Sequence, residues 1–193
     1  YEALKPILDR ILVLLTAPLW VPLGIAVAVA IKLDSPGPIL FIQERVGFRG
    51  RPFRMLKFRS MHVDSEKNGP QFAKKHDARV TRVGRIIRQY RLDEIPQMIN
   101  ILRGEMSLIG PRPEQRKFVD EFTTQIPYYS LRHLVRPGIT GWAQVTQGYA
   151  ADAESTRVKL EHDLFYIKHL SPWLDLLILW KTIQTVLSGF GAR

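Results

Sequence analysis

The chain has 193 residues, which is enough for one domain with a sizeable core, and we expect a single structural unit. It contains no cysteine, so disulfides, thiol nucleophiles and cysteine-based zinc sites are excluded. Its 28 Lys and Arg residues outnumber its 18 Asp and Glu residues, and the formal net charge of +10 favours phosphate-bearing partners such as nucleic acid, anionic lipid or nucleotides.

An apolar stretch without any charged residue runs over residues 11–31. About 20 helical residues reach roughly 30 Å, the thickness of the hydrocarbon core, so length alone predicts a transmembrane helix. Pro18 and Pro22 lie near its middle, where each removes a backbone donor and clashes with the carbonyl one turn back. A break near Pro18 favours a re-entrant hairpin, helix-break-helix, while a kinked span and a soluble core helix stay open as alternatives.

A turn is predicted after the apolar stretch by Ser-Pro-Gly-Pro at 35–38. Residues 39–43 and 53–58 then predict two short strands that form a hairpin. The polar segment 62–77 predicts a loop, and helical patterns dominate from about Arg79 onward. The sequence therefore predicts a mainly helical α+β fold with a small β-hairpin element.

The stretch 172–187 has the pattern of an amphipathic helix. Its apolar side chains gather near one face: Trp173, Leu176, Leu177, Trp180, Ile183 and Leu187. The stretch carries charges and is short for a span, whereas Trp suits the headgroup boundary of a bilayer. An ordinary core helix stays open, but the apolar N-terminal stretch favours an interfacial helix.

Arginines recur with a regular spacing before the middle of the chain, at positions 79, 82, 85, 88 and 91. A helix there would be basic over a broad face and apolar over another. The pattern allows a solvated helix face, contact with anionic lipid, or guanidinium groups that clamp a diphosphate. Charge alone does not decide between them.

Asp93 and Glu94 follow directly after this run, two residues before Pro96. One interpretation is structural, with Asp93 as a helix N-cap and Pro96 in the first turn. The other is chemical, with one carboxylate attacking phosphorus or binding Mg²⁺ while nearby arginines keep it ionised. Both interpretations are compatible, because a helix terminus lets two neighbouring acids share a site.

Two later loops are stiffened by proline. The first, at 110–114, would fix the direction of Arg112 because its two prolines restrict the backbone. The second carries Arg136 and is followed by Trp142 and Gln144, which would suit a nucleobase, although core packing of Trp142 is the simpler interpretation.

Several common motifs are absent from the sequence. It has no P-loop, no dinucleotide-binding G-x-G-x-x-G and no D-x-D of the kind that binds metal in many nucleotide-sugar enzymes. His162 and His169 lie two helical turns apart, so a zinc site is not predicted.

Taken together, several long segments resemble the bacterial sugar transferase family, the monotopic phosphoglycosyl transferases. They are SPGPILFIQERVG (35–47), KFRSM (57–61), RVTRVGRIIRQYRLDEIPQMINILRGEMSLIGPRPE (79–114) and RPGITGWAQV (136–145). The C-terminal part at 147–170 looks most like members that begin exopolysaccharide assembly. The resemblance implies transfer of a sugar-1-phosphate from a nucleotide sugar, with UDP as the expected nucleotide, to a polyprenyl phosphate such as undecaprenyl phosphate.

The resemblance also implies roles for single residues. Asp93 is expected to be the nucleophile that forms a covalent phosphosugar intermediate, and Glu94 is expected to bind Mg²⁺. The phosphate contacts are expected from Lys57, Arg59, Arg88 and Arg112, with Arg136 as a further substrate-binding cation. Pro18 would correspond to the break in the membrane anchor, where Ala17 stands in place of the family's frequent Ser.

These implications set the expected organisation. Residues 1–34 would form the re-entrant membrane anchor and residues 35–193 the catalytic domain at the cytoplasmic face of the bacterial inner membrane. Membrane lipids are then expected partners, and a homodimer is possible. The chain starts at Tyr1 rather than Met, and we expect it to be the C-terminal part of a longer protein without a cleaved signal peptide.

Two rival classes of protein remain. A nucleic-acid-binding module would explain the charge but leaves the apolar stretch at 11–31 unexplained, so we expect no nucleic-acid partner. A non-catalytic membrane scaffold would explain both membrane segments, and it would keep full function with Asp93 and Glu94 replaced.

Overall fold

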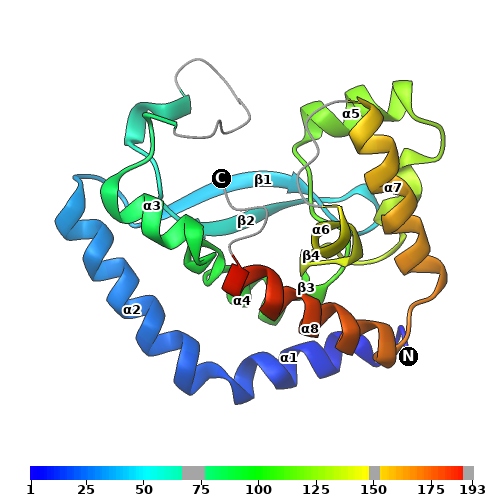
Figure 1. Cartoon of the computed structure of the whole chain (residues 1–193), viewed down its shortest axis with the longest axis horizontal. Helices are drawn as coiled ribbons and strands as arrows, with labels where there is room; N and C mark the ends of the chain where they lie inside the picture. The colour runs from blue at the N-terminus through cyan, green and yellow to red at the C-terminus, as the bar shows by residue number, and fades with distance from the viewer. Residues whose placement is uncertain (67–76, 148–152, 189–193) are drawn as a thin grey trace.

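The computed structural model of the chain describes residues 1–66, 77–147 and 153–188. Its elements confirm the prediction of a mainly helical fold with a small β-hairpin. Figure 1 shows the β-hairpin in the middle of the molecule and the two N-terminal helices along the bottom of the view. Helices α5 (Arg116–Gln125) and α7 (Ala153–Lys168) lie at the right of the view. Most of the loop predicted over 62–77 lies outside the described residues, apart from a short 3₁₀ turn, η2 (Val63–Glu66).

Two helices form the N-terminal part, α1 (Lys5–Leu15) and α2 (Ala17–Asp34), and they meet at an angle at Thr16 (Figure 1). Pro18 lies in the first turn of α2, where its missing N–H is not needed. Pro22 lies inside α2 without ending it, so its predicted part in the break is corrected. The break itself matches the helix-break-helix pattern.

Side chains satisfy the carbonyl groups around this break. Thr16 Oγ1 donates to the carbonyl of Leu12 at 2.8 Å, and Trp20 Nε1 donates to the carbonyl of Val13 at 2.9 Å. The Leu12 carbonyl also keeps its helical bond from the Thr16 N–H, whereas the Val13 carbonyl accepts from the side chains of Thr16 and Trp20. Such bonds are essential wherever water is excluded. By length and composition α2 is long and apolar enough to cross a membrane. Insertion of the pair as a re-entrant hairpin stays a prediction.

The β-hairpin pairs β1 (Leu40–Val46) with β2 (Pro52–Phe58) in antiparallel register, with Leu40 opposite Phe58. The 3₁₀ turn η1 (Phe48–Gly50) joins them. A second pair was not predicted: β3 (Ser107–Ile109) lies parallel to β4 (Gly138–Thr140). It joins the two proline-stiffened loops, and a Cβ atom at Gly138 would lie 2.1 Å from the Gly110 nitrogen, so only glycine allows this approach.

Helical elements surround these strands. In chain order they are α3 (Arg82–Gln89), η3 (Leu92–Glu94), α4 (Gln97–Arg103), α5 (Arg116–Gln125), η4 (Tyr129–Leu134), α6 (Trp142–Thr146), α7 (Ala153–Lys168) and α8 (Pro172–Ser188). Helix α4 packs on β2, and α3 packs on α2. The short turn η3 is thereby placed beside β2.

Helix α8 exposes the apolar face that the sequence predicts, but its other face is apolar as well, so the helix is not amphipathic in the predicted sense. Leu174 and Ile178 are buried against the core, whereas Trp173 and Trp180 are 77% and 60% exposed. The outer faces of α1 and α2 are also apolar and exposed, with Leu33 at 83%. Large apolar surfaces of this kind are typical of partner or membrane contact. Contact of α8 with a membrane interface stays a prediction.

Candidate functional site

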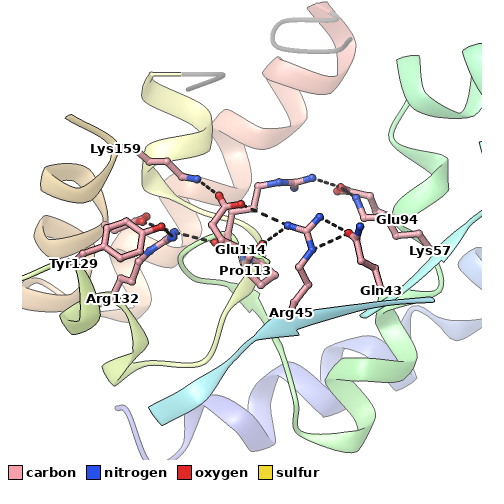
Figure 2. Close-up of polar contacts among 11 residues, drawn as sticks. Gln43, Arg45, Lys57, Glu94, Pro113, Glu114, Tyr129, Arg132 and Lys159 are labelled. Carbon is pink, nitrogen blue, oxygen red and sulfur yellow. Dashed lines mark hydrogen bonds and ion pairs between the residues drawn. The ribbon is translucent and has the colours of Figure 1, made fainter. Parts of the chain in front are cut away.

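Three predicted site residues meet at a single carboxylate. Lys57 Nζ and Arg112 Nη2 each lie 2.9 Å from Glu94 Oε1. Figure 2 shows Lys57 and Glu94 pointing toward each other from β2 and from the neighbouring turn. The side chain of Glu94 is only 6% exposed, so both contacts act where water screens charge weakly. The structure therefore builds a buried cluster of one acid and two cations.

The turn η3 holds Asp93 and Glu94 in place. It begins after Arg91, whose φ of 55° lies in the left-handed region that a non-glycine residue seldom adopts. The N-cap of the following helix α4 is Pro96, which makes no side-chain cap bond. Asp93 is therefore inside a 3₁₀ turn, and its interpretation as an N-cap is wrong. A strained turn that carries two adjacent acids is a common feature of active sites.

A buried amide fixes the distance between this turn and β2. Asn100 in α4 is fully buried, and its Oδ1 atom accepts from the Leu56 N–H at 3.0 Å. Its Nδ2 atom donates to the carbonyl of Arg54 at 2.8 Å. Sequence reasoning missed Asn100, because nothing in its local pattern indicates that it reaches a strand more than 40 residues earlier.

The two neighbouring acids have opposite electrostatics. Burial alone would raise the pKa of Glu94, but the positive charges of Lys57 and Arg112 outweigh it and hold that pKa well below its usual range. Burial raises the pKa of Asp93, and the charge of Glu94 adds to this, while Lys57, Arg88 and Arg112 oppose it. Glu94 is therefore a fixed anion, whereas Asp93 owes its charge to the cations around it.

The arginine run divides between different environments. Arg88, in the last turn of α3, is half-buried and its charge stabilises the ionised form of Asp93. Arg82 and Arg85 are exposed on the same helix. Arg79 pairs with Asp77 at 2.6 Å. Arg88 and Arg91 therefore act electrostatically on the two acids, which fits a phosphate clamp there, while Arg82 and Arg85 form a solvated face.

Two predicted cations lie away from the acid cluster, and their phosphate contacts stay a prediction. Arg59 is 5% exposed, and its guanidinium donates to the carbonyls of Ser35 and Pro36 at 2.8 and 2.6 Å. It fastens the end of α2 to the end of β2, and its buried Nε is left without a partner. Arg136 donates to the carbonyl of Gly104 at 3.0 Å and lines a cavity of about 440 Å³ next to α1, not the acid cluster.

Trp142 follows the simpler of its two interpretations. It is half-buried in the cluster around Ile109 and stacks on Phe165 with a ring separation of 5.9 Å. Core packing therefore accounts for Trp142.

The donor set of the acid cluster fits a magnesium ion that substrate completes. Mg²⁺ takes one or two protein carboxylates together with phosphate oxygens and water. Both ion pairs of Glu94 use Oε1, which leaves Oε2 available as a metal ligand. Within the described ranges, no group of three or more His, Asp or Glu side chains gathers as a metal site by itself. Magnesium binding here depends on substrate and stays a prediction.

Comparisons with known proteins show what the whole chain is similar to. A family model described as bacterial sugar transferase matches residues 1–189. The chain is 59% identical over 193 residues to UDP-N-acetylgalactosamine-undecaprenyl-phosphate N-acetylgalactosaminephosphotransferase of Aeromonas hydrophila, covering all of this chain and 46% of that protein. It is 44% identical over 190 residues to UDP-glucose:undecaprenyl-phosphate glucose-1-phosphate transferase of Caulobacter vibrioides, covering 97% of this chain and 71% of that protein.

A third relative has the same kind of name. UDP-glucose:undecaprenyl-phosphate glucose-1-phosphate transferase of Escherichia coli is 42% identical over 182 residues, covering 93% of this chain and 39% of that protein. The chain thus spans less than half of the Aeromonas and Escherichia relatives.

Proposed function

Because the chain belongs to the bacterial sugar transferase family, we propose that it moves a sugar-1-phosphate from a nucleotide sugar to undecaprenyl phosphate. The products are a polyprenyl-diphosphate sugar and a nucleoside monophosphate, which would begin the assembly of a glycan such as an exopolysaccharide. The observation that carries the proposal is the Glu94 carboxylate, held between Lys57 and Arg112 beside a second acid, Asp93. An anionic diphosphate needs this arrangement of fixed cations next to a nucleophile.

The first step follows from the charges around Asp93. An oxygen of its carboxylate attacks the β-phosphorus, and the bond from that phosphorus to the bridging oxygen breaks. The nucleoside monophosphate leaves with the bridging oxygen and its electron pair. Arg88 and Arg112 offset negative charge on both the attacking carboxylate and the diphosphate, which lowers their repulsion.

The second step restores the enzyme. A phosphate oxygen of the polyprenyl phosphate attacks the phosphorus of the phosphosugar on Asp93, and the acyl-phosphate bond breaks. Asp93 regains its carboxylate, and the lipid carries a diphosphate with the sugar. Both steps need Asp93 to be ionised as nucleophile and as leaving group, so the surrounding cations serve both.

Glu94 is the residue that would hold Mg²⁺. When bound, the ion would neutralise negative charge on the diphosphate oxygens as a Lewis acid. Lys57 and Arg112 fix the direction of the Glu94 carboxylate, so that its remaining oxygen is presented without a search through rotamers.

The exposed apolar helices support a place at the membrane. A re-entrant α1–α2 pair would hold the acid cluster at headgroup depth on the cytoplasmic face, where the lipid phosphate lies while its chain stays in the bilayer. The exposed Trp173 and Trp180 of α8 suit the same boundary.

A panel of nucleotide sugars tests the reaction. Purified protein, undecaprenyl phosphate and Mg²⁺ are mixed with UDP-N-acetylgalactosamine, UDP-glucose and other nucleotide sugars, and nucleoside monophosphate and lipid product are measured. We expect at least one sugar to give both products, Asp93→Asn to give neither, and Asp120→Asn, on exposed α5, to match the parent. Equal turnover by Asp93→Asn, or no product from any sugar, would contradict the proposal.

A further inference from the structure

The loop that carries Arg112 is held from behind by charged side chains. Arg132 Nη2 donates to the backbone carbonyl of Arg112 at 2.8 Å, and Arg45 Nη1 donates to the next carbonyl, that of Pro113, at 3.1 Å. Figure 2 shows Arg45 and Arg132 approaching Pro113 from opposite sides. Two successive peptide groups are thus fixed by guanidinium groups from two different elements, β1 and η4.

Helix α7 supplies the charges that hold these groups. Asp163 Oδ2 lies 2.8 Å from Arg132 Nη2, and both side chains are only 2% exposed. One turn earlier on α7, Lys159 pairs with Glu114. Glu114 Oε2 also lies 3.5 Å from Arg45 Nη1. Because Lys159 and Asp163 are four residues apart, they lie on the same face of α7. Lys159 contacts the loop directly at Glu114, and Asp163 contacts it through Arg132, which binds the Arg112 carbonyl.

Burial of the Arg132–Asp163 pair is not explained by stability alone. Desolvation of two charges costs several kcal/mol, and apolar residues of similar volume often fill such a place equally well. Arg132 Nη1 also donates to the Tyr129 hydroxyl at 2.8 Å, so its planar group is held at both ends. Only a guanidinium in this plane joins a carboxylate, a hydroxyl and the Arg112 carbonyl at once.

We propose that the buried Arg132–Asp163 pair positions Arg112, by holding its backbone carbonyl so that its side chain reaches Glu94. The inference rests on the proposed function, in which Arg112 stabilises the transferring phosphate. Arg132 and Asp163 are therefore positioning residues, since they touch the Arg112 backbone and not the acid cluster. The two prolines beside Arg112 make the device effective, because a stiff loop transmits the position of one peptide group to the next.

The test replaces the pair by apolar residues of similar size, in the variant Arg132→Met/Asp163→Leu. The matched control is Arg116→Met/Asp120→Leu, which removes an exposed pair at 3.7 Å on α5. Amide hydrogen exchange is measured in the whole protein. The Val46 and Gly138 amides donate to the carbonyls of Glu114 and Pro111, on either side of Arg112. We expect these two amides to exchange about ten-fold faster in the first variant, with core amides such as that of Ile101 unchanged, and no change in the control.

A double-mutant cycle adds a functional measurement. Arg112→Ala is introduced into the parent and into Arg132→Met/Asp163→Leu, and release of nucleoside monophosphate is compared. We expect a loss of about 100-fold in the parent but about ten-fold in the variant, which has already lost the placement of Arg112. Equal losses in both backgrounds, or unchanged exchange at Val46 and Gly138, would overturn the inference.

A second variant keeps the proposal testable if Arg132→Met/Asp163→Leu does not fold. Arg132→Lys keeps the charge opposite Asp163 but lacks the planar fork, so it should fold and still show faster exchange at Val46 and Gly138. Exchange like that of the parent would count against the proposal. If the parent releases no nucleoside monophosphate from any nucleotide sugar, the proposed function fails, while the exchange measurement still decides whether the pair positions the loop.

Discussion

Asp93 and Glu94 are adjacent in the chain but stand in different surroundings. Glu94 forms ion pairs with two cations at 2.9 Å. Asp93 is half-buried and interacts electrostatically with Lys57 and Arg112 without a direct ion pair to either. A tightly paired carboxylate is a poor nucleophile but a well-oriented metal ligand. This difference supports our proposal that Asp93 attacks phosphorus and that Glu94 binds magnesium.

Removal of metal tests the assignment of Glu94. We expect EDTA to abolish turnover and added Mg²⁺ to restore it, because charge on the diphosphate would otherwise be offset only in part. Glu94→Gln should reduce turnover by about 100-fold or more at low Mg²⁺, while Glu121→Gln, on the exposed side of α5, should not. Undiminished turnover of Glu94→Gln at low Mg²⁺ would remove Glu94 from the metal site.

His133 gives a pH-dependent contribution to stability. Burial lowers its pKa to about 4, and the nearby charges of Arg132 and Arg116 add to this effect. The unfolded chain takes up the proton near pH 6.5, so the contribution is complete above about 6.5 and is lost as pH falls toward the folded pKa. Over this window the free energy of unfolding falls further than it would without His133.

The prediction is a difference between two pH values. Urea unfolding at pH 8 and pH 4 should show a stability loss that is about 1–2 kcal/mol smaller in His133→Gln than in the parent, after allowance for solvent screening of this half-buried ring. The exposed His169→Gln serves as control. Equal losses in parent and His133→Gln would show that the ring titrates as it does in the unfolded chain.

Sequence reasoning at the residue scale succeeded where a motif carried the residue. Lys57, Arg88 and Arg112 do surround the two acids, although they come from three separate segments. It did not foresee the surroundings of Arg59, because a lone arginine in a basic segment does not reveal that buried carbonyls will accept its hydrogen bonds. It missed the Arg132–Asp163 pair as well, since its partners lie 31 residues apart and neither belongs to a recognisable motif.

At the scale of elements, the junction of α1 and α2 shows how local chemistry sets a bend. In a continuous helix Pro18 would clash with the carbonyl of Leu14, whereas it fits the first turn of a new helix. Pro22 does not lie in a first turn, yet α2 accommodates it without ending. The sequence indicated a break near Pro18, and the helices do meet at Thr16, but it did not show that Pro22 would be accommodated, because both prolines have the same local signature.

Substitution of the two prolines separates their roles. With spin labels at the exposed positions Glu2 and Leu33, we expect Pro18→Ala to lengthen the distance between labels, because α1 and α2 can then align. Pro22→Ala is the matched control and should leave the distance unchanged. A longer distance in Pro22→Ala, or none in Pro18→Ala, would show that the bend has another cause.

The β-strands show a similar limit. The hairpin of β1 and β2 was predicted because its strands are close in sequence and joined by glycines. The parallel pair β3 and β4 has only three residues in each strand and joins segments about 30 residues apart, so no periodicity announces it. Yet this pair fixes both proline-stiffened loops, including the one that presents Arg112.

For the whole molecule, the central question is how it meets the membrane. If α1 and α2 form a re-entrant hairpin, both ends should face the cytoplasm, in agreement with the basic charge of the remaining chain. The chain has no cysteine, so single cysteines at Glu2 and Lys32 give unambiguous labelling in sealed cells. We expect both to be protected from an impermeant reagent. Labelling at Glu2 from the periplasm would show a true span.

The covalent intermediate on Asp93 tests the account most directly. Protein is incubated with a nucleotide sugar that it turns over, in the presence of Mg²⁺ and without polyprenyl phosphate, and the released nucleotide and the protein mass are measured. The account predicts release of about one equivalent of nucleoside monophosphate, with a sugar-phosphate mass added to the peptide that contains Asp93, and loss of both signals in Asp93→Asn. Nucleotide release that requires the lipid acceptor, with no adduct on Asp93, would contradict it and favour direct displacement by the lipid phosphate.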